Sequence, residues 1–128
     1  LGLIPWSPLD GGILAGFEKT SEGRRSTEDL QKALEQHRAQ LEPYEALCRE
    51  LGEKPADVAI AWLLHNPVVT APIVGATRLP HLEDAVAAVD VRLSDEERAA
   101  LDALAACGLV PPLRLVNAVE PAPFEESA

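Results

Sequence analysis

Methionine is absent from the 128 residues of this chain, and cysteine and aromatic residues are scarce. The two cysteines, Cys48 and Cys107, show neither metal-ligand nor redox-motif spacing, which is typical of a protein kept in a reducing compartment. No run of about 18 apolar residues is present, and no signal peptide is visible. We therefore expect a reduced, cytoplasmic chain with no membrane association and no bound metal.

Basic residues are also few. The sequence has 11 basic and 21 acidic side chains, which give a formal net charge of −10. A surface of this sign repels a phosphate backbone, so nucleic acid is not an expected partner. A single phosphorylated small molecule can still bind where an arginine or lysine is placed locally. The hydrophobic fraction of 47% is sufficient for one modest domain with a core.

Two short apolar runs, residues 1–6 and 68–74, predict buried β-strands. Helical spacing fills most of the sequence between and after them. Pro43 interrupts the first helical segment and predicts a kink or the start of a second helix there. Ser94 and Glu97 form a capping box at the start of the last helix. The predicted helical segments cover residues 26–52, 55–66, 79–89 and 94 onward.

The alternation of strands and helices predicts an α/β fold with parallel strands. Two strands alone would keep open edges and an uncovered apolar face. The chain also opens inside an apolar run, without a methionine. We therefore expect it to be part of a longer protein or to need a partner subunit, with residues 108–128 as an irregular, proline-rich tail.

The stretch from Thr70 to Arg78 is the most informative, because it predicts a strand, a glycine turn and a helix start. Gly75 allows close approach of a ligand to the backbone. A helix N-terminus offers free N–H groups and a partial positive charge. Arg78 adds a charge suited to bidentate phosphate binding. These residues predict an anion site, although an ordinary strand–helix turn with a surface arginine explains them about equally well.

Four segments in this order and spacing resemble the aldo-keto reductase family. They are IPWSPLDGGIL (4–14), PADVAIAWLL (55–64), APIVGATR (71–78) and LSDEE (93–97). They are similar, in turn, to the seventh strand and its loop, the seventh barrel helix, the eighth strand with its cofactor loop, and the terminal helix of that family. The resemblance implies a partial (β/α)₈ TIM barrel, in which residues 1–107 supply the last two parallel strands with their surrounding helices.

The resemblance also implies a cofactor, NADPH with NADH as the alternative, and a small carbonyl substrate, either an aldehyde or a ketone. Trp6 would stack on the nicotinamide ring. Arg78 stands where the family holds the 2′-phosphate of the adenosine ribose. The other implied contacts are Ser7, Pro8, Leu9 and Gly11 at the pyrophosphate, Gly75, Ala76 and Thr77 at the ribose, and His81 and Asp84 at the adenosine end.

No catalytic residue is expected within the chain, because the tyrosine, aspartate, lysine and histidine of the family's chemistry belong to earlier strands. Tyr44 is the only tyrosine, and its position on an apolar helix face predicts a packing role. We therefore expect the cofactor-binding, C-terminal portion of a reductase. The alternative is a non-catalytic, truncated chain that binds nucleotide weakly or pairs with another subunit.

Overall fold

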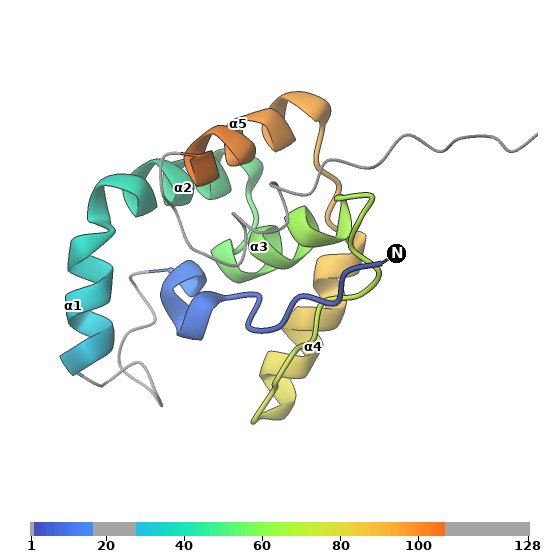
Figure 1. Ribbon diagram of the computed structural model, residues 1–128, viewed down its shortest axis with the longest axis horizontal. Coiled ribbons are helices and arrows are strands. Elements are labelled where there is room, and N and C mark those ends of the chain that lie inside the picture. The colour runs from blue at the N-terminus through green and yellow to red at the C-terminus, as the bar shows by residue number, and fades with distance from the viewer. Residues whose placement is uncertain (1, 17–27, 107–128) are drawn as a thin grey trace, which may run out of the picture.

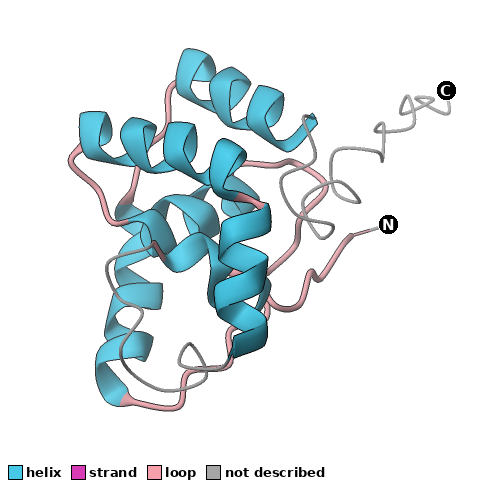
Figure 2. Ribbon diagram, turned by 90° about the vertical axis from the view of Figure 1, so that its left-hand side faces the viewer, coloured by secondary structure: helices cyan, strands magenta, loops and turns pink. Residues whose placement is uncertain are grey.

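The computed structural model describes residues 2–16 and 28–106 (Figure 1). The predicted helix start at Ser26 and the predicted tail, residues 108–128, lie outside the described residues. Within them the chain is helical, with connecting loops (Figure 2). The elements are η1 (Asp10–Ala15), α1 (Glu28–Gln36), α2 (Arg38–Leu51), α3 (Pro55–Leu64), α4 (Leu79–Ala87), η4 (Ala88–Asp90) and α5 (Asp95–Ala106).

The two predicted strands lie side by side and run parallel, but they form only two isolated bridges, Leu3 with Val69 and Trp6 with Ile73. The Ile73 N–H donates to the carbonyl of Pro5 at 2.8 Å. The expectation of two continuous strands is therefore wrong for the described residues. Proline is the physical reason, because Pro5 and Pro72 carry no N–H for the ladder. The two bridges lie three positions apart on one segment and four on the other, so the register shifts between them.

Helix α3 is the centre of the core, as its apolar sequence predicts. Residues 57–63 are all buried, and the helix packs against η1, α2, α4 and η4. Pro55 occupies its first turn, where a missing N–H costs nothing. The Trp62 indole N–H donates to the Asp102 carboxylate at 2.9 Å and so joins α5 to α3. The capping box of α5 is confirmed, since the Ser94 N–H donates to Glu97 and the Glu97 N–H to the Ser94 hydroxyl.

The break in the first helical segment falls at His37, between α1 and α2, and not at Pro43 as expected. Pro43 lies inside α2, where it has no N–H to donate to the carbonyl four residues earlier, yet the helix continues through it. Gly52 ends α2 in the left-handed conformation, as predicted, with a φ of 71°. Tyr44 is fully buried and donates its hydroxyl proton to the Pro55 carbonyl, which confirms its packing role.

Helix α4 extends along one side of the molecule (Figure 1). Its predicted apolar face forms, but the described residues leave it uncovered. Four side chains on this face are about half exposed or more: Leu79 (67%), Leu82 (48%), Val86 (62%) and Val89 (56%). Ile4 and Ile73, on the bridged segments, are exposed as well. The described part of the chain therefore presents an apolar surface that helix packing within it does not bury.

Candidate functional site

The parallel bridge between Trp6 and Ile73 determines where the candidate site lies. Because both segments run in the same direction, the residues that follow them leave from the same end of the pair. The first segment continues into the loop that starts at Ser7, and the second into the loop that starts at Gly75. The structure therefore brings the two predicted cofactor loops together, although more than 60 residues separate them in the sequence.

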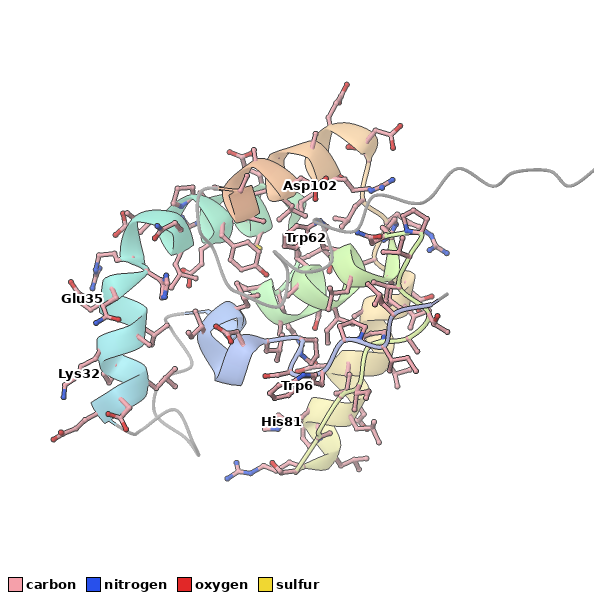
Figure 3. All side chains as sticks on the ribbon, in the orientation of Figure 1. Trp6, Lys32, Glu35, Trp62, His81 and Asp102 are labelled. Atoms are coloured by element: carbon pink, nitrogen blue, oxygen red, sulfur yellow. The ribbon has the colours of Figure 1, made fainter. Side chains whose placement is uncertain are left out.

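Trp6 stands at this exit with an exposed side chain, 77% accessible to solvent. Its ring is not packed into the core, in contrast to Trp62, which is buried on α3. Figure 3 labels Trp6 on the first bridged segment and His81 on α4. An exposed indole at the end of a bridged segment offers a flat apolar face to a planar ligand.

The loop after Trp6 is preorganised by its own hydrogen bonds. The Gly11 N–H donates to the Ser7 hydroxyl at 3.2 Å, and the Asp10 N–H donates to the Ser7 carbonyl at 2.9 Å. Ser7 and Asp10 adopt positive φ angles of 53° and 47°, which are unusual for residues other than glycine. Such backbone strain concentrates at ligand sites. Pro8 is buried and Leu9 packs against the core, so both anchor the loop.

Asp10 was not predicted as a site residue, and it brings a carboxyl group into this loop. Burial raises its pKa, and the nearby His37 opposes that shift. A carboxylate here limits how close a pyrophosphate can come to this side of the loop. In the sequence, Asp10 is recognisable as the acidic residue directly before Gly11 and Gly12.

The second loop, residues 75–78, is exposed throughout. A Cβ atom added to Gly75 would have no other heavy atom within 4 Å. The backbone of Gly75 does not adopt a left-handed φ. The described structure itself therefore does not require glycine at this position. Open space above a small residue next to an arginine fits a group that approaches from outside the protein.

The helix start offers fewer free donors than the sequence predicted. Pro80 has no N–H, and the N–H groups of His81 and Leu82 both donate back to the Arg78 carbonyl, at 3.1 and 3.3 Å. An anion at this end would therefore meet chiefly the guanidinium of Arg78 and the N–H groups of the preceding loop. His81 is exposed and Asp84 is half-buried on α4.

A lysine that sequence reasoning missed contacts the middle of α4. The Lys54 Nζ lies 2.5 Å from the Asp84 Oδ1, and this contact raises the pKa of Lys54. Lys54 precedes Pro55 at the start of α3.

The chemistry that the described residues can perform is binding and orientation. Tyr44 is buried, and burial holds its pKa well above the usual value, so it is not placed to protonate a substrate. Within residues 2–16 and 28–106, no group of three or more His, Cys, Asp or Glu side chains is arranged to hold a metal ion. The helices in these ranges are also too short or too polar to cross a membrane.

Residues 1–106 match the family model of the Aldo/keto reductase family. The chain belongs to this family, as the four resembling segments predicted, and the family implies a (β/α)₈ barrel. The chain is similar to an uncharacterized oxidoreductase, YrpG, of Bacillus subtilis (strain 168), with 47% identity over 96 residues. It is also 40% identical over 102 residues to a putative aryl-alcohol dehydrogenase, C977.14c, of Schizosaccharomyces pombe.

These matches cover 75% and 76% of this chain but only 29% and 28% of the two relatives. An uncharacterized oxidoreductase of Mycobacterium bovis, Mb2320, is 38% identical over 104 residues, which are 77% of this chain and 32% of that protein. The chain thus spans less than a third of the length of these relatives.

Proposed function

We propose that this chain forms the cofactor-binding, C-terminal portion of an NAD(P)H-dependent oxidoreductase that reduces aldehydes or ketones. The parallel bridge of Trp6 with Ile73 carries the proposal, because it sets the loops after both segments at one end of the pair. Family membership and the oxidoreductase names of the relatives support the reaction class.

The residues fit an elongated dinucleotide. Trp6 would stack on the nicotinamide, and Ser7, Pro8, Leu9 and Gly11 would line the pyrophosphate. At the other end, Gly75, Ala76, Thr77 and Arg78 would hold the ribose and its 2′-phosphate, with His81 and Asp84 near the adenosine. When bound, the cofactor supplies a hydride to the carbonyl carbon of the substrate.

Arg78 favours NADPH over NADH in this proposal, because its planar guanidinium matches a phosphate group. The substrate would be a small carbonyl compound bound outside the described residues. Residues 1–107 would act as the barrel portion and 108–128 as a tail, and the end of the family match at residue 106 supports this division. A cytoplasmic location and the absence of a nucleic-acid partner stay predictions.

The second candidate is a non-catalytic chain that binds nucleotide weakly or pairs with another subunit. The uncovered apolar face of α4 favours it, because such a surface is typical of a protein contact. Both candidates predict that this chain alone shows no reductase turnover with NADPH and any aldehyde, since neither places a catalytic tyrosine within it. Turnover in a clean preparation would contradict both.

A measurement of nucleotide binding distinguishes the proposed cofactor site from an ordinary strand–helix turn with a surface arginine. We expect NADPH to quench the fluorescence of the exposed Trp6, with Trp6→Phe removing most of that change while the buried Trp62 still emits. Arg78→Glu should weaken NADPH by about tenfold or more and NADH far less, because a like charge then faces the 2′-phosphate. Equal weakening of both cofactors would show that Arg78 does not face this phosphate, and a chain that binds neither would refute the proposal.

A further inference from the structure

The second bridged segment, residues 69–74, keeps one backbone edge open. Thr70 and Ile73 donate their N–H groups at 2.8 Å to carbonyls of the first bridged segment. Successive N–H groups of an extended chain point to opposite sides, so those of Ala71 and Val74 are directed away from that segment. Neither of them has a hydrogen-bond acceptor in the part of the chain that the structure describes. An edge of this kind is a template for a further β-strand.

The order of the elements determines where such a strand would lie. Helices α1 to α3 connect the first bridged segment to the second, and α4 follows the second. In the barrel that the family implies, strand–helix units follow one another in a single sense, because their crossovers are right-handed. The next strand therefore belongs at the open edge of residues 69–74, and α4 is the helix that would cover it.

Helix α4 is suited to cover a strand. Its apolar face consists of Leu79, Leu82, Val86 and Val89, which are 48% to 67% exposed. The opposite side is already packed, since Ala88, directly after α4, is 1% exposed where α3 contacts α4 and η4. An uncovered aliphatic surface of this kind is typical of a protein contact, because burial of its apolar area is favourable.

Within residues 2–16 and 28–106 the chain does not supply this strand itself. After α4 it continues through η4 into α5, which packs against α2 and is joined to α3 by the hydrogen bond between Trp62 and Asp102. The chain also spans less than a third of the length of the relatives named above. A (β/α)₈ barrel has eight strands, so most strands of such a protein lie outside the matched part.

We propose that the open edge of residues 69–74 and the apolar face of α4 together dock a parallel, apolar β-strand from the part of an aldo-keto reductase that this chain does not contain. Carbonyl groups of that strand accept the N–H groups of Ala71 and Val74, and its apolar side chains cover Leu82 and Val86. A second copy of this chain is disfavoured, because both copies carry a formal net charge of −10. The inference goes beyond nucleotide binding and does not depend on it.

The test co-expresses the tagged 128-residue chain with the part of YrpG that lies outside its matched 96 residues, without added nucleotide. The measured quantity is the fraction of the YrpG part that the chain retains at one-to-one stoichiometry. Val86→Glu should lower this fraction by about tenfold or more, since it places a charge in an apolar contact. Ala71→Pro should have the same effect, because it removes an N–H group from the open edge.

Each substitution has a matched control. Ala99→Glu adds the same charge at an exposed position of α5, away from α4 in Figure 1, and should keep the retained fraction within about twofold. Ala71→Ser keeps the backbone N–H and a small side chain, and should do likewise. All these substitutions fall on exposed residues, so the melting temperatures of the isolated variants should stay close to that of the unmodified chain. In the complex, hydrogen exchange of the Ala71 and Val74 amides should slow by about tenfold or more.

Several results would overturn the inference. A chain that retains none of the YrpG part does not dock it, and unchanged exchange of the Ala71 amide in a complex would place the contact elsewhere. Equal losses in Val86→Glu and Ala99→Glu would show only repulsion by the added charge. Self-association that Val86→Glu abolishes would make a second copy the occupant, and better retention by a chain that ends at Ala106 would make residues 107–128 the occupant. A nucleotide titration tests the proposed function separately, so either proposal can fail alone.

Discussion

Gly75→Ala tests whether the open space at Gly75 belongs to a ligand. An added Cβ meets nothing within 4 Å in the described structure, and the backbone conformation does not demand glycine. The free energy of unfolding should therefore change by less than about 1 kcal/mol, with a stabilising sign because alanine restricts the unfolded chain. If a cofactor packs against this position, the extra methyl group costs about 1–3 kcal/mol of binding, which is about 5- to 150-fold in affinity.

Gly52→Ala is the matched control, because Gly52 also has open space around it but has a φ of 71°. A Cβ in the left-handed conformation costs about 1–2 kcal/mol, so this variant should unfold more easily and keep its affinity for NADPH. Chemical denaturation and fluorescence titration of both variants give the two quantities. Unchanged NADPH affinity in Gly75→Ala, with binding intact in the unmodified chain, would refute the assignment of this loop to the cofactor.

Three further predictions concern stability and its pH dependence. Trp62→Phe should lower the free energy of unfolding by about 1–3 kcal/mol, because it removes the hydrogen bond to Asp102 and leaves that carboxylate without the indole donor; a thermal melt checks this. Ser94→Ala should cost about 0.5–2 kcal/mol through loss of the capping box with Glu97, and an unchanged melt would contradict a stabilising cap. Asp10→Asn should raise the melting temperature at about pH 7 but not at about pH 3. Burial raises the folded-state pKa of Asp10, so the charge of this carboxylate opposes folding only above the ordinary carboxyl pKa. Equal changes in melting temperature at both pH values would refute this.

Local rules predicted the elements whose signals lie within a few residues. The Ser94 capping box, the Gly52 helix end and the all-round burial of α3 follow from short spacings, and the structure confirms them. The break at His37 was missed because proline is the strongest local signal, yet α2 continues through Pro43. Strand continuity was overestimated, since a ladder depends on neighbouring strands as well as on the apolar run itself.

The sequence predicted the loop residues of the candidate site but not Lys54. Arg78 was a candidate from the strand, glycine turn and helix start of one stretch, whereas Trp6 was a candidate only through the resemblance to the aldo-keto reductase family. Lys54 could not be found in this way, because its relation to Asp84 exists only once α3 packs beside α4. Pairs across packed helices leave no fixed spacing in a single sequence.

Helix α4 links the site to the uncovered surface. Asp84 faces α3 on one side of the helix, and Leu82 and Val86 are exposed on the other. The two sides of α4 therefore have separate properties: one packs against α3, and the other is an apolar surface that the described residues do not cover.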